Sequence, residues 1–305
     1  MSPSRLRAPA ALTAAGRRIL GLYRRATWRV RRLPDVILIG AQKCGTKSLR
    51  HFLRQHPHVV PPDTAHVSAH ESAPHFFDGG LDPDVDTYLL GEAWYRAFFP
   101  RADRSPPHHR VLDASPLYLL NPLAPRRIFD LVPDVKLVVL LRDPTERAIS
   151  HYFHEVRKGH ESVPLMEALQ AEESRVRTAL LEQDYKHPSF IHHTYRRRGR
   201  YHEQISRYLR FFTPTRLLVV QSERFFAEPV ETVQEVLHFI GVDPDWRPPD
   251  LSPRGVAEDR TPVGEEVRDH LDEHFRPHNR RLYDLLGRDF GWCARGAERR
   301  GSLLA

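Results

Sequence analysis

The amino-acid sequence predicts an α/β protein in which helices flank a central parallel sheet in three layers. Four short apolar runs indicate buried strands, and stretches with helical spacing separate them, as parallel strands require. The runs are 36–39 (VILI), 110–113 (RVLD), 135–141 (VKLVVLL) and 216–220 (RLLVV). A glycine-bracketed loop, Gly40 to Leu49, lies between the first run and a helical stretch. This order is typical of phosphate-binding folds, so we expect a three-layer P-loop-like fold.

The helix after this loop has a predicted face and a predicted end. Leu49, Phe52 and Leu53 share one helical face. The helix should end near His56, because Pro57 disfavours helical backbone in the residue before it.

A second helix is predicted directly after the third strand. Asp143 is placed to cap it, Pro144 suits its first position and Glu146 would complete a capping box. Its expected apolar face comprises Ile149, Tyr152, Phe153 and Val156.

The rest of the chain continues this alternation. A helix over 201–212 should lead into the fourth strand, and another should begin at Pro229 and end at Gly241. The Pro-rich stretch 244–253 indicates a surface loop. Two closing helices are expected, the first with apolar residues Val267, Leu271 and Phe275 and the second with Leu282, Leu285 and Leu286.

The charge distribution sets the first 34 residues apart. Residues 1–34 hold nine arginines and no acidic residue, whereas the whole chain has a net charge of +7. We therefore divide the chain into a basic arm (1–34), a main domain (35–292) and a C-terminal tail (293–305). Apolar residues in the arm recur at helical spacing, at Ala15, Ile19, Leu22, Tyr23 and Ala26. Such a helix could lie on an anionic membrane surface; the alternatives are a loosely ordered tail and a helix packed on the domain.

Composition argues against several classes of protein. No run reaches the roughly 18 apolar residues of a membrane span, and arginines interrupt the N-terminal stretch where a secretory signal would need continuous apolar sequence. The two cysteines, Cys44 and Cys293, do not indicate a disulfide framework, so we expect a cytoplasmic protein. No nucleic-acid-binding module is evident. The 41 arginines against five lysines fit a GC-rich, bacterial coding sequence.

The loop itself departs from the nucleoside-triphosphate pattern G-x-x-x-x-G-K-[ST]. Thr46 follows Gly45, and Lys43 adds a second lysine to Lys47. Two of the chain's five lysines therefore lie in one loop, which indicates a functional role for compact positive charge. Backbone N–H groups from Gly45 to Ser48 would hold a phosphate, and Lys43 could reach a bridging oxygen.

A second anion site is predicted in the segment 140–152 (LLRDPTERAISHY). Arg142 ends a strand and Ser150 lies two turns into the next helix, so both should lie near the first site at the same sheet edge. The structural alternative for Arg142 is a salt bridge with Asp143 or Glu146.

Together these segments resemble the sulfotransferases that use 3′-phosphoadenosine-5′-phosphosulfate (PAPS). GAQKCGTKSL resembles their 5′-phosphosulfate loop and RDPTERAISHY their 3′-phosphate motif. The resemblance spans about residues 35–292 and looks closest to the carbohydrate branch, such as the heparan-type enzymes. It continues in order through HFFD (75–78), WYRAFFP (94–100), DASPLYL (113–119), RGRYHEQISRYL (198–209) and LLGRDFGW (285–292).

The resemblance implies PAPS as co-substrate, with no metal, and a hydroxyl acceptor that is a saccharide. Arg142 and Ser150 would bind the 3′-phosphate, and Arg260 or Arg254, in a loop over 253–263, would touch the nucleotide. The 5′-phosphosulfate would be held by Lys43, Cys44, Gly45, Thr46, Lys47 and Ser48. Lys43 would also be catalytic, because it can stabilise charge on the leaving phosphate.

The resemblance also implies a general base near the HFFD segment. The family's glutamate lies two residues before the histidine, a position occupied here by Ala73. We expect Glu71, four residues before the histidine, to be the base, with His75 second and Asp113 third.

Two other function classes are compatible with this sequence. The loop is one insertion from that of a P-loop kinase or nucleotidase, although the acid after the third strand, Asp143, is placed as a cap and not as a magnesium ligand. A non-catalytic binder acting through the arm is a third class.

Residues 159–195 should form much of the acceptor side, and the run of three arginines at 196–198 indicates either acceptor-binding charge or a solvated face. The 19 histidines show no metal-ligand spacing.

Overall fold

The computed structural model describes residues 14–64, 73–255 and 262–292, and its centre is a five-stranded parallel sheet. The strand order is β2-β3-β1-β4-β5. The strands are β1 (Val36–Gly40), β2 (Val59–Val60), β3 (Arg110–Ala114), β4 (Lys136–Leu141) and β5 (Leu217–Gln221). The predicted fold class is confirmed, and four strands fall where expected. The sequence did not predict β2, because two residues carry no periodicity.

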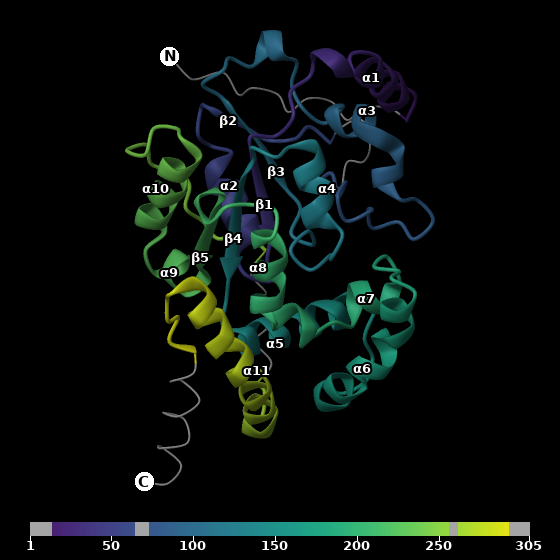
Figure 1. Cartoon of the computed structure of the whole chain (residues 1–305), viewed down its shortest axis with the longest axis vertical. Coiled ribbons are helices and arrows are strands. Elements are labelled where there is room, and N and C mark those ends of the chain that lie inside the picture. Colours follow the sequence, from purple (N-terminus) through teal and green to yellow (C-terminus); the bar gives the residue numbers. More distant parts are fainter. Residues whose placement is uncertain (1–13, 65–72, 256–261, 293–305) are drawn as a thin grey trace, which may run out of the picture.

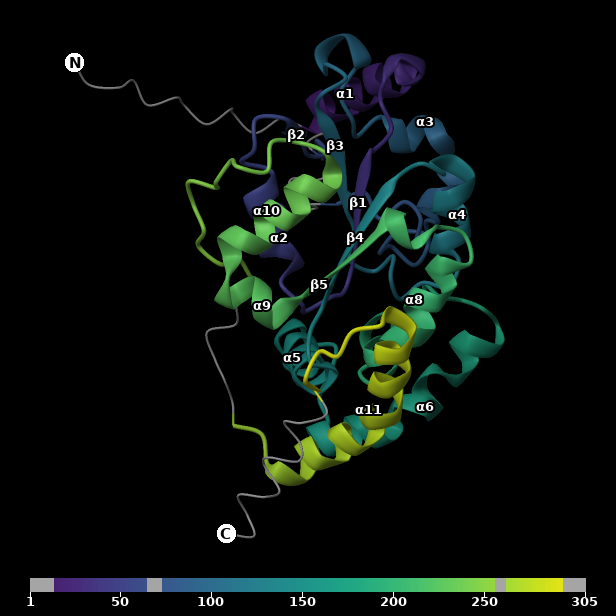
Figure 2. The same cartoon turned by 60° about the vertical axis from the view of Figure 1, so that its left-hand side comes forward.

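Helices cover both faces of this sheet. Figure 2 shows α2 (Thr46–Leu53), α9 (Ser222–Ala227) and α10 (Pro229–Ile240) on one face and α4 (Ala124–Leu131) and α8 (Tyr201–Leu209) on the other. The central strand β1 is buried at every position, which explains why its sequence is apolar without alternation. Three layers result, as predicted.

Helix α5 (Pro144–Lys158) begins where predicted, but its cap differs from the prediction. The Asp143 carboxylate accepts a hydrogen bond from the Thr145 N–H at 2.9 Å, as an N-cap should. The expected capping box is wrong, because the Asp143 N–H donates to Glu223 at 2.8 Å while Glu146 contacts Arg268. The predicted apolar face is also too wide, since Val156 is exposed.

The two predicted closing helices are one helix, α11 (Glu265–Leu286), with Pro277 inside it. Its buried residues Leu271, Phe275 and Leu282 continue across the proline. Helix α11 packs against α8 and α5, and this tertiary packing keeps the helix continuous through a residue that removes one backbone hydrogen bond.

The remaining helices surround this core (Figure 1). Helices α6 (Leu165–Leu181) and α7 (Pro188–His192) pack on each other, and α3 (Gly91–Arg96) packs on the N-terminal helix α1 (Ala14–Ala26). The 3-10 turns are η1 (Trp28–Val30), η2 (Thr87–Leu90), η3 (Ala102–Arg104), η4 (Arg197–Gly199) and η5 (Pro214–Arg216).

The predicted amphipathic helix of the arm is present as α1, and it contacts the domain. Arg24 donates to the Ala97 carbonyl at 2.9 Å and pairs with Asp63, while Ile19 and Leu22 are 68% exposed. These contacts show that α1 packs on the domain, which was one of the predicted alternatives. Among the helices within the described ranges, none has the length and apolar character to cross a membrane.

Candidate active site

The sheet topology brings the two predicted anion sites to one edge. β2 and β3 lie on one side of β1, and β4 and β5 lie on the other. The strand order therefore reverses at β1, and ligands of open parallel sheets bind at the carboxyl ends of the strands beside such a point. The loop over 41–45 joins β1 to α2, and Arg142 follows β4 directly. Lys43 and Arg142 meet at this point, where an Arg142 Nη1 donates to the Lys43 carbonyl at 3.5 Å.

The loop is held in an unusual backbone conformation. Lys43 has φ of 73° and Gly45 has φ of 92°, both in the left-handed region. Glycine is required at position 45, because a Cβ there would lie 2.9 Å from the ring of Phe226. A lysine in this region costs energy and persists only where the surroundings fix it, which is a recognised feature of functional loops.

Cys44 is a core residue of the loop. Its thiol is fully buried, lies 3.8 Å from the Tyr201 hydroxyl and has its pKa raised by burial to about 11. The Cys44 N–H donates to Ala41 at 3.2 Å, and its carbonyl accepts from the Ser222 hydroxyl at 3.0 Å. Both backbone groups of Cys44 are thus occupied in shaping the loop, so neither is available to bind the sulfuryl donor.

Cations crowd around Lys43. Burial and, in decreasing order of effect, the nearby Arg157, Lys47 and Arg142 together lower the pKa of Lys43 to about 8. Such a cluster repels itself until an anion binds, so it is suited to a ligand with several negative charges. Arg157 was not predicted, although Ser150 and Arg157 are seven residues apart on α5 and so share a helical face.

The helix after the loop supplies the second element of this anion site. The first-turn N–H groups of α2, at Thr46, Lys47 and Ser48, have no acceptors within the helix. The Ser48 hydroxyl accepts from the Arg254 N–H at 2.9 Å. Gly255 lies so close that a Cβ there would be 2.8 Å from Lys47 Cδ. The segment predicted to touch the nucleotide therefore begins against the loop, while Arg260 lies outside the described residues.

Arg142 is positioned for a second anion. Its carbonyl accepts from the Tyr201 hydroxyl at 3.0 Å, which fixes the backbone at the end of β4. The alternative predicted for its side chain is partly realised, since a guanidinium nitrogen lies 3.8 Å from a Glu146 oxygen, too far for a direct hydrogen bond. Ser150 is half-buried on the same helix as Glu146.

The run of arginines at 196–198 is not a solvated face. Arg198 is 2% exposed, donates to the Thr194 hydroxyl at 2.8 Å and contacts the Gln42 side chain in the phosphate loop. Burial lowers its pKa to about 9. The Arg196 and Arg197 N–H groups donate to the buried Glu172 carboxylate at 2.7 and 2.9 Å. The solvated-face interpretation was wrong for Arg198, which is buried between α7 and α8, while Arg196 and Arg197 are half-buried.

The histidine of the HFFD segment is oriented by the aspartate of the same segment. His75 Nδ1 lies 2.7 Å from a carboxylate oxygen of the buried Asp78, and the His75 N–H donates to Ser115 at 3.2 Å. Asp78 and Arg198 line the same small cavity, and Arg198 also contacts Gln42 of the phosphate loop. Glu71, the first predicted base, lies outside the described residues.

Asp113, the third predicted base, is built into the core. Its fully buried carboxylate accepts hydrogen bonds from Tyr95 at 2.8 Å, Ser115 at 2.8 Å and Tyr118 at 3.0 Å. Burial raises its pKa. Three donors on one carboxylate hold β3 to the segments that follow it, and this arrangement favours a structural role for Asp113 over proton transfer.

Comparison with known proteins agrees with this geometry. A family model described as the sulfotransferase domain matches residues 33–251. The heparan sulfate glucosamine 3-O-sulfotransferase 6 of Mus musculus is 31% identical over 286 residues, which cover 86% of this chain and 74% of the relative. The Homo sapiens protein of the same name is 32% identical with the same coverage. The crystal structure of a sulfotransferase from Alicyclobacillus acidocaldarius superimposes with a TM-score of 0.68 at 31% identity, covering 86% of this chain and 99% of that one.

Proposed function

Since this chain belongs to the sulfotransferase family and is a PAPS-dependent enzyme, we propose that it transfers the sulfuryl group to a hydroxyl of a saccharide. The observation that carries the proposal is the cation cluster of Lys43, Lys47, Arg142 and Arg157 around the loop after β1. The acceptor class is supported by the relatives, whose names describe heparan sulfate glucosamine 3-O-sulfotransferases.

We assign the loop to the 5′ end of PAPS. The N–H groups of Thr46, Lys47 and Ser48 would bind the phosphosulfate at the start of α2. In the reaction the acceptor oxygen forms a bond to sulfur, the bond from sulfur to the bridging phosphate oxygen breaks, and the hydroxyl proton passes to a base. Negative charge grows on the bridging oxygen, and Lys43 would stabilise it. The lysine and arginine charges suffice for this role, so we propose that the transfer step needs no metal.

We assign Arg142 and Ser150 to the 3′-phosphate, which distinguishes PAPS from ATP. Calorimetric titration without magnesium should show tighter binding of adenosine 3′,5′-bisphosphate than of ADP by about 2–4 kcal/mol, roughly 30- to 1,000-fold. Equal affinities, or a preference for ADP, would contradict the assignment. The kinase alternative is not favoured, since Asp143 is occupied as the cap of α5.

Two residues compete for the role of general base. Glu71 is our first assignment, and His75 is second because Asp78 orients its imidazole. Glu71→Gln and His75→Asn variants, compared by kcat with saturating PAPS, decide between them. The variant that loses the base should fall by about 100- to 10,000-fold while its affinity for adenosine 3′,5′-bisphosphate stays unchanged. A severe loss of kcat in His75→Asn, with none in Glu71→Gln, would assign the role of general base to His75.

The acceptor can be tested directly. We expect a panel of amino-sugar oligosaccharides, incubated with PAPS and the full chain, to yield products heavier by one sulfuryl group in mass spectrometry. Sulfation of phenols or steroids, with none of saccharides, would contradict the acceptor class while leaving the donor site intact.

Two further proposals concern the surroundings of the enzyme. A cytoplasmic location is proposed from the cysteine content, and peripheral membrane contact from the basic arm and its exposed Ile19 and Leu22. Deletion of residues 1–33 tests the second: loss of binding to anionic vesicles with sulfotransferase activity retained would support it, whereas unchanged vesicle binding would refute it.

A further inference from the structure

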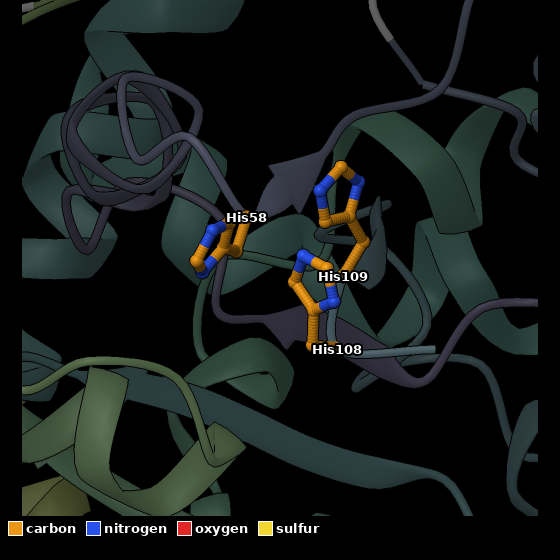
Figure 3. Close-up of side chains that lie close together, drawn as sticks. All are labelled: His58, His108 and His109. Atoms are coloured by element: carbon orange, nitrogen blue, oxygen red, sulfur yellow. The ribbon is translucent and has the colours of Figure 1, made fainter. Parts of the chain in front are cut away.

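Three histidines gather at the sheet edge opposite the phosphate loop. His58 directly precedes β2, and His108 and His109 directly precede β3. Because β2 and β3 are parallel neighbours, these residues lie at the amino ends of the strands, whereas the candidate active site lies at the carboxyl ends. Figure 3 shows the three imidazoles grouped together, with His58 on one chain segment and the other two on another.

The three rings face one another closely. The ring centroids of His58 and His108 are 4.7 Å apart, those of His108 and His109 are 4.7 Å apart, and those of His58 and His109 are 5.4 Å apart. One nitrogen from each ring lies within 4.8 Å of the other two. In the part of the chain that the structure describes, the buried Nδ1 of His109 has no hydrogen-bond partner. A buried ring nitrogen without a partner is costly unless a ligand binds it.

The backbone that carries these rings is held in place. The Arg110 N–H donates to the His58 carbonyl at 2.7 Å, which joins the two segments, and the His109 N–H donates to Pro106 at 2.9 Å. Arg110 also donates from its guanidinium to the carbonyls of Ile240 and Gly241 at 2.9 and 3.2 Å.

The turn before His108 is fixed by Arg32. Its guanidinium donates to the Ser105 hydroxyl and the Pro106 carbonyl at 3.1 and 3.0 Å. The positive charge of Arg32 is balanced by Asp35 at 2.8 Å. The ring positions are therefore set by the fold.

We propose that His58, His108 and His109 form a binding site for a divalent transition-metal ion of the zinc type. Imidazole nitrogen is a preferred ligand for zinc, copper and nickel ions. Tetrahedral zinc with Zn–N bonds of about 2.0–2.1 Å places its ligands about 3.3 Å apart, so small rotations of the three rings close the site. Three protein ligands leave a fourth position for water, and the exposed His108 gives the ion a path of entry. The bound ion joins the loop before β2 to the turn before β3 and stabilises this edge of the sheet.

Two other groups among the described residues serve as comparisons. Glu155 with His160 and His192 already forms hydrogen bonds, at 2.9 Å from one carboxylate oxygen to each ring, so that group needs no metal. His202, Glu203 and His278 form a third group between α8 and α11 with two ring nitrogens in place of three. Variants in both groups are therefore matched controls.

The test uses the full chain after treatment with a chelator, titrated with zinc sulfate in a calorimeter. We expect one zinc ion per chain with a Kd of about 1 μM or lower and a higher Tm with zinc than without it. Loss of an outer-shell partner weakens metal binding by roughly 10- to 100-fold. Because His108 would bind the ion directly, His108→Gln should weaken zinc binding by more than this. His160→Gln and His278→Gln should bind zinc as the unmodified chain does. His108 is exposed, so its variant should keep the Tm of the metal-free chain.

Several outcomes would overturn the proposal. Zinc binding that is absent, or that is equal in His108→Gln, contradicts it, and loss of binding in His160→Gln or His278→Gln assigns the ion to another group. X-ray absorption of the zinc complex should show three imidazole ligands. Affinity for adenosine 3′,5′-bisphosphate should not change in His108→Gln, which separates this test from that of the proposed function.

Discussion

The protonation of Lys43 offers the sharpest test of the transfer chemistry. Burial and the neighbouring Arg157, Lys47 and Arg142 lower the pKa of Lys43 from 10.5 to about 8. The difference corresponds to about 3 kcal/mol by which the empty site disfavours the ammonium form. A bound phosphosulfate supplies negative charge, so binding should restore much of this energy and raise the pKa of Lys43 in the complex.

The pH dependence of kcat/KM for PAPS therefore has a predicted shape. Because kcat/KM reports the unliganded enzyme, it should fall tenfold per pH unit above about 8, whereas kcat should fall only at higher pH. Steady-state rates from pH 6.5 to 10 measure both, at saturating acceptor.

Substitution of the lysine gives the decisive comparison. Lys43→Ala should lower kcat by about 100- to 1,000-fold and remove the inflection near pH 8 from kcat/KM. Lys158→Ala is the control, since that lysine is exposed at the end of the same α5 helix that carries Arg157. An inflection that persists in Lys43→Ala would refute the assignment.

Three further variants test separate parts of the structure. Arg142→Ala should weaken adenosine 3′,5′-bisphosphate by about 10- to 150-fold in calorimetry and leave ADP nearly unchanged; equal losses for both ligands would remove Arg142 from the 3′ site. Asp113→Ala should lower the free energy of unfolding in urea by about 3 kcal/mol or more, because three hydroxyl donors lose their acceptor, and a loss below about 1 kcal/mol would contradict the structural role. Asp143 is 2% exposed, and burial raises its pKa from 3.8 to about 6. The folded state therefore binds more protons than the unfolded state between these values, and stability falls as pH rises through this window. Asp143→Asn should keep the cap, and its stability should not fall in this way. Its free energy of unfolding should therefore rise by up to about 3 kcal/mol relative to the unmodified chain between pH 4 and 7. If the difference in stability between the two proteins does not change with pH, Asp143 does not titrate there.

Much of the fold follows from local sequence, and its exceptions have physical causes. β1 and β4 are apolar throughout because both faces of the sheet are covered, and such runs can be identified without knowing their partners. β2 could not be predicted, since Val59 and Val60 form a strand only by pairing with β3. Likewise, helix α11 continues through Pro277 because its packing on α8 outweighs a local preference.

The candidate site shows the same division between local and tertiary information. Lys43, Lys47 and Arg142 could be found from the sequence because each is placed by a strand end or a helix start. The contact of Arg198 with Gln42 could not, since it joins residues 156 positions apart. The three-histidine group was missed for the same reason: His58 and His108 become neighbours only through the pairing of β2 with β3.

The anion site at the phosphate loop and the cation site at the three histidines lie at opposite edges of the sheet, so the charge at one site has little effect on the other. In a parallel sheet every strand presents its carboxyl end at one edge and its amino end at the other, so the strand length separates the two. β3 spans Arg110–Ala114, five residues of about 3.3 Å each, or roughly 16 Å. This exceeds the Debye length of about 8 Å at physiological salt. Zinc at the histidine edge should therefore alter stability and leave the affinity for the sulfuryl donor unchanged, whereas a shift in donor affinity on zinc binding would show that the sheet transmits strain from one edge to the other.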